Sequence, residues 1–116
     1  MNKKIEEVAK EWNVLSKKLR RYCERYLRDL LKKNNNQIDW EDIELPEYVS
    51  VAYDGGNHPE YASNVFSTVY GVKLDEDENI TLHLEDCDEY QLQNVSVNEL
   101  YTLCDFLDQY KQKIGI

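Results

Sequence analysis

A chain of 116 residues, 41% of them hydrophobic, is long enough for one modest core and too short for two, so we expect one domain over residues 1–116. Thirteen aromatic residues (nine Tyr, two Phe and two Trp) argue against a disordered chain. Residues 1–33 carry eleven Lys and Arg against five acidic residues, whereas residues 34–116 carry three against eighteen. The strong negative charge of residues 34–116 would repel a phosphate backbone, which argues against direct nucleic-acid binding.

The cysteines and the hydropathy pattern indicate the cellular compartment. Three cysteines without a CxxC spacing make a disulfide framework improbable, which favours a reducing environment. Glu6, Glu7 and Lys10 interrupt any apolar segment of a signal peptide, and no stretch approaches the roughly 18 apolar residues of a membrane span. We therefore expect a cytoplasmic protein with no membrane contact.

Residues 1–33 are predicted to form a long basic amphipathic helix. Its apolar positions follow steps of three and four: Ile5, Val8, Trp12, Leu15, Leu19, Tyr22 and Tyr26. The three asparagines at 34–36 are expected to end the helix, because Asn tolerates the left-handed conformation. About 30 residues make a rod of about 45 Å. The rest of the chain would have a radius of gyration of about 12 Å, so one end of the rod should project or pack against another chain.

The apolar stripe of this helix has two interpretations. As a coiled-coil seam it would form a homo-oligomer, and as ordinary core it would pack against the chain's own sheet and last helix. Aromatic residues such as Trp12, Tyr22 and Tyr26 suit a two-stranded seam poorly, which favours intrachain packing with both tyrosines buried. Self-association of the projecting part stays open.

The middle of the chain predicts strands joined by short connections. Residues 37–46 are expected to form an acidic connector, with Ile38, Trp40, Ile43 and Leu45 as anchors on the core. Alternating apolar residues then predict strands at 48–53, 65–74, 80–85 and 89–95. Turn signals separate them at 54–59 and 75–79.

The chain is predicted to end in a second helix. Ser96 and Glu99 have the spacing of a capping box, and a helical stripe continues to about Lys113. The predicted fold is therefore α+β: a long N-terminal helix, a four-stranded antiparallel meander sheet and a C-terminal helix, with both helices on one face of the sheet.

Patterns of metal ligation or catalysis are weak. Asp75, Asp77, Asn79 and Asp86 follow the ligand spacing of a calcium-binding loop, but Ile80 stands where such a loop needs glycine, so a charged hairpin turn is the preferred interpretation. His83 and Cys87 are four residues apart, which falls short of the paired ligands of a zinc site. We expect no cofactor, no resident metal and no enzymatic activity.

Among the predicted loops, the segment 54–61 is the strongest candidate for binding a ligand. Two adjacent glycines and Pro59 would present His58 and Tyr61 to a ligand, although an extended hairpin connection uses the same residue types. The alternative function is accordingly a metal-dependent or small-ligand site, with or without catalysis, around this loop and His83.

The acidic surface carries the preferred functional hypothesis. Its excess of carboxylates is larger than solubility requires and suits a basic protein partner. We expect a small non-enzymatic interaction protein, one version of which is an inhibitor or nucleic-acid mimic of the kind that phages and mobile elements encode. The residues expected to bind the partner are Asp54, Asn57, His58, Glu60, Tyr61, Asp75, Glu76, Asp77, Glu78, Asp86, Asp88 and Glu89.

Overall fold

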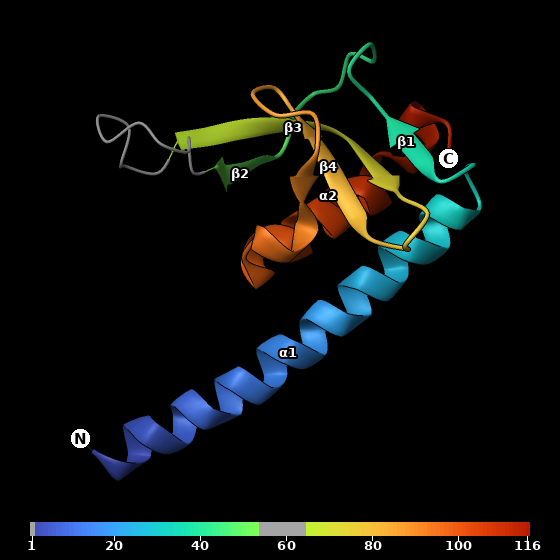
Figure 1. Cartoon of the computed structure of the whole chain (residues 1–116). Coiled ribbons are helices and arrows are strands. Elements are labelled where there is room, and N and C mark those ends of the chain that lie inside the picture. Colours follow the sequence, from blue (N-terminus) through green and yellow to red (C-terminus); the bar gives the residue numbers. More distant parts are fainter. Residues whose placement is uncertain (1, 54–64) are drawn as a thin grey trace.

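A computed structural model describes residues 2–53 and 65–116 and confirms the α+β class (Figure 1). Its elements, in chain order, are α1 (Lys3–Lys32), β1 (Gln37–Asp39), β2 (Ser50–Tyr53), β3 (Val65–Leu74), β4 (Ile80–Leu84), β5 (Tyr90–Gln91), the 3₁₀ helix η2 (Leu92–Asn94) and α2 (Val97–Ile114). Neither helix of the described residues combines the length and the apolar character needed to cross a membrane.

Both ends of α1 are set by asparagine. The side-chain oxygen of Asn2 accepts a hydrogen bond from the Lys4 N–H at 2.9 Å and caps the first turn. After the last turn, Asn35 and Asn36 adopt φ values of 59° and 65°, the left-handed conformation that asparagine tolerates. The predicted helix and its predicted end are therefore confirmed.

Strand β3 is the centre of the sheet. It pairs antiparallel with β4 along one edge, and β4 pairs with β5. Along the other edge, β2 pairs with residues 65–68 and β1 pairs with residues 71–73, so β1 and β2 lie end to end. The sheet therefore contains one more strand than the predicted four-stranded meander.

The extra strand corrects the interpretation of 37–46 as a plain connector. Residues 37–39 are too few to show an alternating pattern, and they become a strand only because the edge of β3 is available to pair with them. The anchors of this segment were predicted correctly, since Ile38, Trp40 and Leu45 are buried and Ile43 packs against the core.

The predicted strand 89–95 is shorter in the structure. Only Tyr90 and Gln91 pair with β4, and the chain then turns into η2. Leu92 and Val95 lie on either side of this turn and are 3% and 1% exposed. A straight strand cannot direct residues three apart to one face, whereas a 3₁₀ turn brings them together in the core.

Helix α2 begins with the predicted capping box. The Ser96 hydroxyl accepts from the Glu99 N–H at 3.3 Å and donates to the Glu99 carboxylate at 2.9 Å. The second carboxylate oxygen of Glu99 accepts from the Ala52 N–H of β2 at 2.6 Å, which ties the start of the helix to the edge of the sheet. Gly115 ends the helix at φ 92°.

The core lies between the sheet and the helices. Helix α2 lies behind the sheet in the view of Figure 1, and the last turns of α1 pack against α2 and β3. The core side of α2 carries Leu100, Leu103, Phe106, Leu107 and Tyr110. Cys104 packs beside this row and donates to the Cys23 carbonyl at 3.7 Å. Burial raises the pKa of the Cys104 thiol, as does the nearby Cys23, so the thiol stays protonated and behaves as a small core residue.

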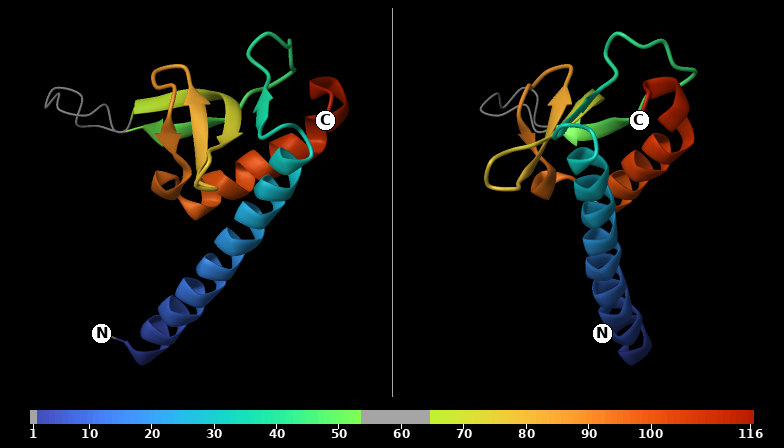
Figure 2. Two further views of the ribbon diagram at one scale, coloured as in Figure 1. Left: turned by 45° about the vertical axis from the view of Figure 1, so that its right-hand side comes forward. Right: turned by 90° about the vertical axis from the view of Figure 1, so that its right-hand side faces the viewer.

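Only the C-terminal part of α1 contributes to this core. Its buried residues are Cys23, Leu27 and Leu31, whereas the N-terminal half extends away from the sheet and α2 in both views of Figure 2. The predicted projection of one end is confirmed. The predicted burial of Tyr22 was wrong, because its side chain is 57% exposed. A straight helix rotates against a seven-residue repeat, so the buried face has moved to the line of Cys23 and Leu27.

Candidate functional site

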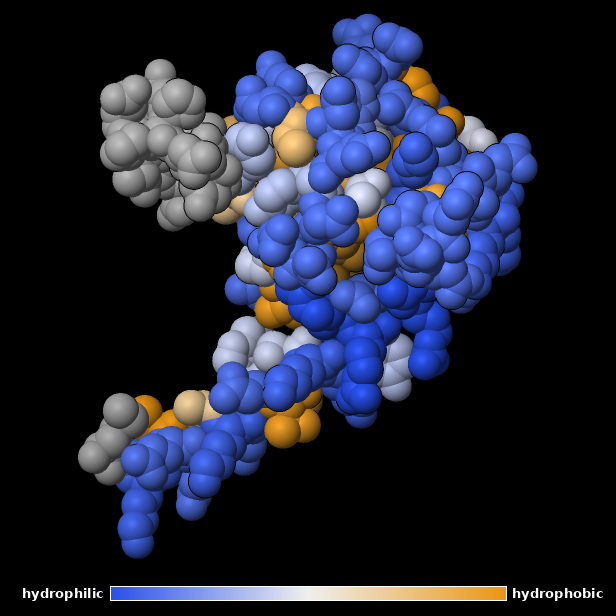
Figure 3. Space-filling model, viewed as in Figure 1, coloured by the Kyte–Doolittle hydropathy of each residue, from blue (hydrophilic) through white to orange (hydrophobic). Residues whose placement is uncertain are grey.

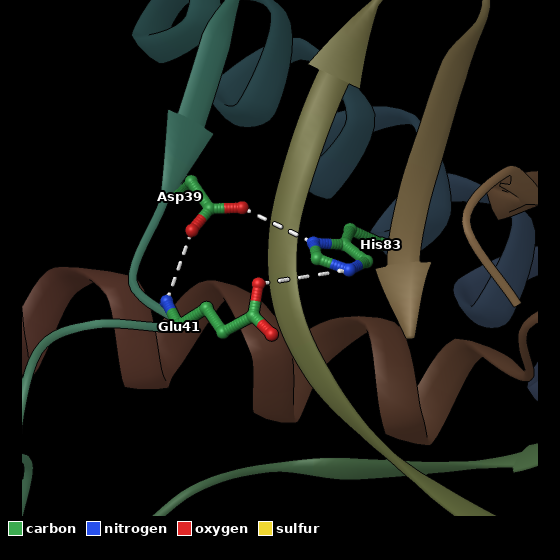
Figure 4. A group of neighbouring side chains, drawn as sticks. All are labelled: Asp39, Glu41 and His83. Carbon is green, nitrogen blue, oxygen red and sulfur yellow. Dashed lines mark hydrogen bonds and ion pairs between the residues drawn. The ribbon is translucent and has the colours of Figure 1, made fainter. Parts of the chain in front are cut away.

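Three residues from three strands lie in one row across the outer face of the sheet. Asp39 of β1 is paired with Gly71 of β3, and Gly71 is paired with His83 of β4. Because Gly71 has no side chain, the Asp39 carboxylate can lie over it and reach the imidazole. The Asp39 Oδ2 and His83 Nδ1 atoms are 3.1 Å apart, although β3 separates their strands (Figure 4).

The absence of a side chain at Gly71 is required by this arrangement. A Cβ atom added there would come within 2.8 Å of Asp39 Oδ2 and within 3.0 Å of the Ile38 carbonyl oxygen. Both distances are shorter than normal contacts, so the carboxylate would have to move. The register of β3 also shifts between Val69 and Gly71, and this β-bulge aligns the glycine with the two polar residues.

Trp40 fixes the bulge and the chain that carries the acids. Its backbone N–H donates to the Tyr70 carbonyl at 2.8 Å, and its indole N–H donates to the Val69 carbonyl at 2.9 Å. The indole is fully buried, with its ring centroid 5.5 Å from that of Phe106. Asp39 and Glu41, on either side of the buried Trp40, are both exposed, and their carboxylates both approach His83.

The second imidazole nitrogen faces two more carboxylates. His83 Nε2 lies 3.6 Å from Asp88 Oδ1 and 3.9 Å from Glu41 Oε2. The Glu41 N–H donates to Asp39 Oδ1 at 3.0 Å, which leaves Asp39 Oδ2 for the histidine. The Tyr70 ring flanks the imidazole, with centroids 6.2 Å apart. The histidine is therefore surrounded by three carboxylates and one aromatic ring.

This cluster can accept a cation. Asp39, Glu41 and His83 each offer a ligand atom, and these atoms lie within 4.8 Å of one another. One imidazole nitrogen and two carboxylate oxygens are ligand atoms that zinc and other divalent ions accept. Asp39 and His83 also line a shallow depression of about 260 Å³ that contains Lys73 and Asp88.

The residues predicted to bind a partner do not form one patch. Asp54, Asn57, His58, Glu60 and Tyr61 lie outside the described residues. The others are divided between the two ends of β4: Asp75, Glu76, Asp77 and Glu78 in the turn before it, and Asp86, Asp88 and Glu89 in the segment after it. The five residues of β4 separate these groups by about 16 Å.

The turn at 75–79 uses its polar groups locally. Asp75 Oδ1 accepts from the backbone N–H groups of Asp77 and Asn79 at 2.9 and 2.8 Å, and Glu78 adopts φ 62°. The preferred interpretation of this segment as a charged turn is therefore confirmed. The Glu78 carboxylate also forms an ion pair with Lys32 of α1 at 3.1 Å.

The basic helix leaves the acids around His83 uncovered. Among the described residues, Lys32–Glu78 is the one ion pair that joins α1 to the acidic part of the chain. The Arg20 guanidinium instead donates to the carbonyl of the buried Val95. It also forms an ion pair within α1, with Nη1 lying 3.8 Å from Glu24 Oε1. The end of the sheet that carries Asp39, Glu41 and Asp88 thus keeps its negative charge facing water.

Sequence analysis singled out His83 and Asp88 but not the other two acids beside the imidazole. Asp39 and Glu41 were placed in a connector, and their proximity to His83 depends on the pairing of β1 with β3. The one available signal was the pattern of two acids on either side of an apolar anchor, Trp40, and it did not indicate which strand they would approach.

Comparison with protein families, with curated proteins and with solved structures finds no match for this chain.

Proposed function

We propose that this chain is a non-enzymatic interaction protein whose acidic end binds a basic protein surface. The acidic end is defined as Asp39, Glu41 and Asp88 around His83, together with Asp86 and Glu89 of the segment after β4. The observation that carries the proposal is that, within the described part of the chain, no Lys or Arg forms an ion pair with these five carboxylates. Carboxylates that keep their charge on a rigid sheet can steer and orient a basic partner.

The test uses two variants that each remove two negative charges. Asp88→Asn/Glu89→Gln removes two charges from the acidic end, and Glu76→Gln/Asp77→Asn removes two from the turn at the opposite end of β4. Immobilised wild-type chain is used to capture proteins from a lysate of the source cells at low salt, and mass spectrometry identifies them. We expect a basic protein that is released as salt rises, because exposed charges are screened.

The affinity of that protein for each variant then decides the proposal. Neutralising Asp88 and Glu89 should weaken binding about three- to tenfold, as expected for two exposed charge pairs, whereas the variant of Glu76 and Asp77 should bind like the wild type. Equal losses in both variants would show that net charge alone matters, and unchanged binding in both would contradict the proposed surface. Competition by duplex DNA would favour the nucleic-acid-mimic version.

A second candidate function is binding of a divalent metal ion, favoured by the placement of Asp39, Glu41 and His83. Zn²⁺ held by these groups would stabilise the fold by about 2.7 kcal/mol at a hundredfold excess over its dissociation constant. We expect the melting temperature to rise with Zn²⁺ in the wild type. The rise should disappear in His83→Gln, which removes a ligand, and shrink in Gly71→Ala, which displaces the Asp39 carboxylate.

The matched control for the metal is Cys87→Ala, a change at another potential ligand that lies outside the Asp39–Glu41–His83 group. It should keep the Zn²⁺-dependent rise. No rise in the wild type, or an equal rise in His83→Gln, would show that this group holds no specific ion.

A further inference from the structure

The projecting half of α1 carries a row of large apolar side chains that face water. Along the rod, the exposed fractions of Ile5, Val8, Trp12, Leu15 and Tyr22 lie between 51% and 58%. Their three- and four-residue steps place them on one side of the helix, where Leu19 continues the row. Figure 3 shows hydrophobic residues in orange along this part of the rod. Single exposed apolar residues are common, but a continuous row indicates an interface.

Within the described residues, the chain leaves five side chains of this row facing water, whereas Leu19 packs partly against the core. The buried residues of α1 begin at Cys23, and the preceding turns extend away from the sheet and α2 (Figure 2). A helical segment of this length without tertiary contacts is only marginally stable in water. A partner that covers the row would bury the exposed apolar surface and would also stabilise the projecting part of the helix.

We propose that the partner is the same segment of a second copy, packed as an antiparallel helix pair over residues 5–22. A large side chain has a surface on the order of 200 Å², so five half-exposed ones present about 500 Å² on each helix. Two copies would therefore bury about 1,000 Å² before the flanking residues are counted, which reaches the size of a specific interface.

The side chains of the row favour the antiparallel direction. In a parallel pair each residue faces its own copy, so Trp12 would meet Trp12 and Tyr22 would meet Tyr22 in a narrow seam. Each heptad of the row has two apolar positions, and in the antiparallel pair the first of them faces the second of the partner helix. Trp12 then faces the partner's Leu15, Val8 faces the partner's Leu19, and Ile5 faces the partner's Tyr22. Each bulky aromatic ring is thus packed against a smaller aliphatic side chain.

The charges beside the row favour the same direction. One flank carries Lys4, Glu11, Lys18 and Arg25, and the other carries the uncharged Asn2, Ala9, Ser16 and Cys23. A parallel pair would set the charged flank of each helix against the uncharged flank of the other. The antiparallel pair brings the two charged flanks together.

The register follows from those flanks. With Trp12 opposite the partner's Leu15, Glu11 of each copy lies beside the partner's Lys18, and two ion pairs form. Shifting one helix by seven residues, so that Trp12 faces the partner's Val8, would bring Glu11 against Glu11 and Lys4 against Lys18. In the proposed register Lys4 approaches the partner's Arg25 at each end, where both side chains are exposed and screened by salt.

The first experiment measures the dimer dissociation constant by sedimentation equilibrium for the full chain. Leu15→Glu, in the row, should raise it at least a hundredfold. Val14→Glu changes the neighbouring side chain, which is 67% exposed but lies off the row, and should change it by less than about threefold. Both replaced side chains face water in the single chain, so circular dichroism should show the same fold for both variants at low concentration.

The second experiment tests direction and register. Glu11→Lys and Lys18→Glu should each raise the dissociation constant about three- to tenfold, because each converts both ion pairs into like-charged pairs. The double variant Glu11→Lys/Lys18→Glu restores both pairs with exchanged signs and should return close to the wild-type value. In a parallel pair these residues face uncharged neighbours, and no such rescue would occur.

The contradicting results are defined in advance. A wild-type chain that remains monomeric at 1 mM overturns the proposal, as does an equal effect of Leu15→Glu and Val14→Glu. Binding of the monomer to vesicles of phosphatidylcholine and phosphatidylglycerol, lost in Leu15→Glu, would assign the row to a lipid surface instead. Failure of the rescue would reject the antiparallel register.

Discussion

Replacing Trp40 with alanine should lower the free energy of unfolding by about 3–5 kcal/mol, the range for removal of a buried aromatic side chain. The indole is fully buried against Phe106, and its N–H is bonded to the Val69 carbonyl in the bulge of β3. The alanine variant would leave both a cavity and an unpaired carbonyl. Urea unfolding followed by circular dichroism measures the loss.

The second tryptophan provides the control. Trp12→Ala removes a side chain that is 51% exposed and should change the free energy of unfolding by less than about 0.5 kcal/mol at a concentration where the chain is monomeric. Trp40→Phe keeps an aromatic ring but loses the donor, so its loss should be intermediate, about 1–3 kcal/mol. A loss in Trp12→Ala as large as that in Trp40→Ala would contradict the described packing.

A comparison of two leucines in α1 is expected to give the other large effect. Leu27 is fully buried, and Leu27→Ala should cost about 2–5 kcal/mol of unfolding free energy. Leu15 lies in the same helix with 58% exposure, and Leu15→Ala should stay within about 0.5 kcal/mol in the monomer. Because the residue type and the helix are the same, the difference isolates burial. Chemical denaturation of both variants at low protein concentration measures it.

Equal losses in the two leucine variants would mean that the core covers the whole of α1. A loss in Leu15→Ala that grows with protein concentration would instead agree with the proposed helix pair, since the variant would then be losing contacts to a second copy.

Segments with a strong local pattern could be predicted from the sequence. The bounds of β3 at Val65 and Leu74 were predicted, because alternation continues over ten residues between clear turn signals. The start of α2 was also predicted, because Ser96 and Glu99 satisfy each other within one turn. In both cases the sequence pattern that predicts the element lies within the segment itself.

Features that depend on distant segments could not be predicted. β1 contains three residues and exists because β3 offers an edge, and the Asp39–His83 contact spans 44 residues of sequence. Likewise, the stripe of α1 indicated a helix but not which part would be covered. The part of α1 that is buried depends on how far the sheet and α2 extend along the helix. It also depends on the rotation of the buried face around the helix, which leaves Tyr22 exposed to water.

The acidic residues show the same limitation on a larger scale. Asp75–Glu78 and Asp86–Glu89 are close in the sequence and were expected to act together, but β4 lies between them and separates them along its length. The acids that lie together around His83 of β4 come from β1, from the turn after β1 and from the segment after β4, and only the sheet brings them into contact.

The carboxylate of Glu99 is shared by two segments that are 47 residues apart, the first turn of α2 and the Ala52 N–H of β2. Neither segment can open without weakening a bond of the other, so fraying of the helix and peeling of the edge strand become one cooperative event. A four-residue edge strand is thereby tied to the first turn of an 18-residue helix.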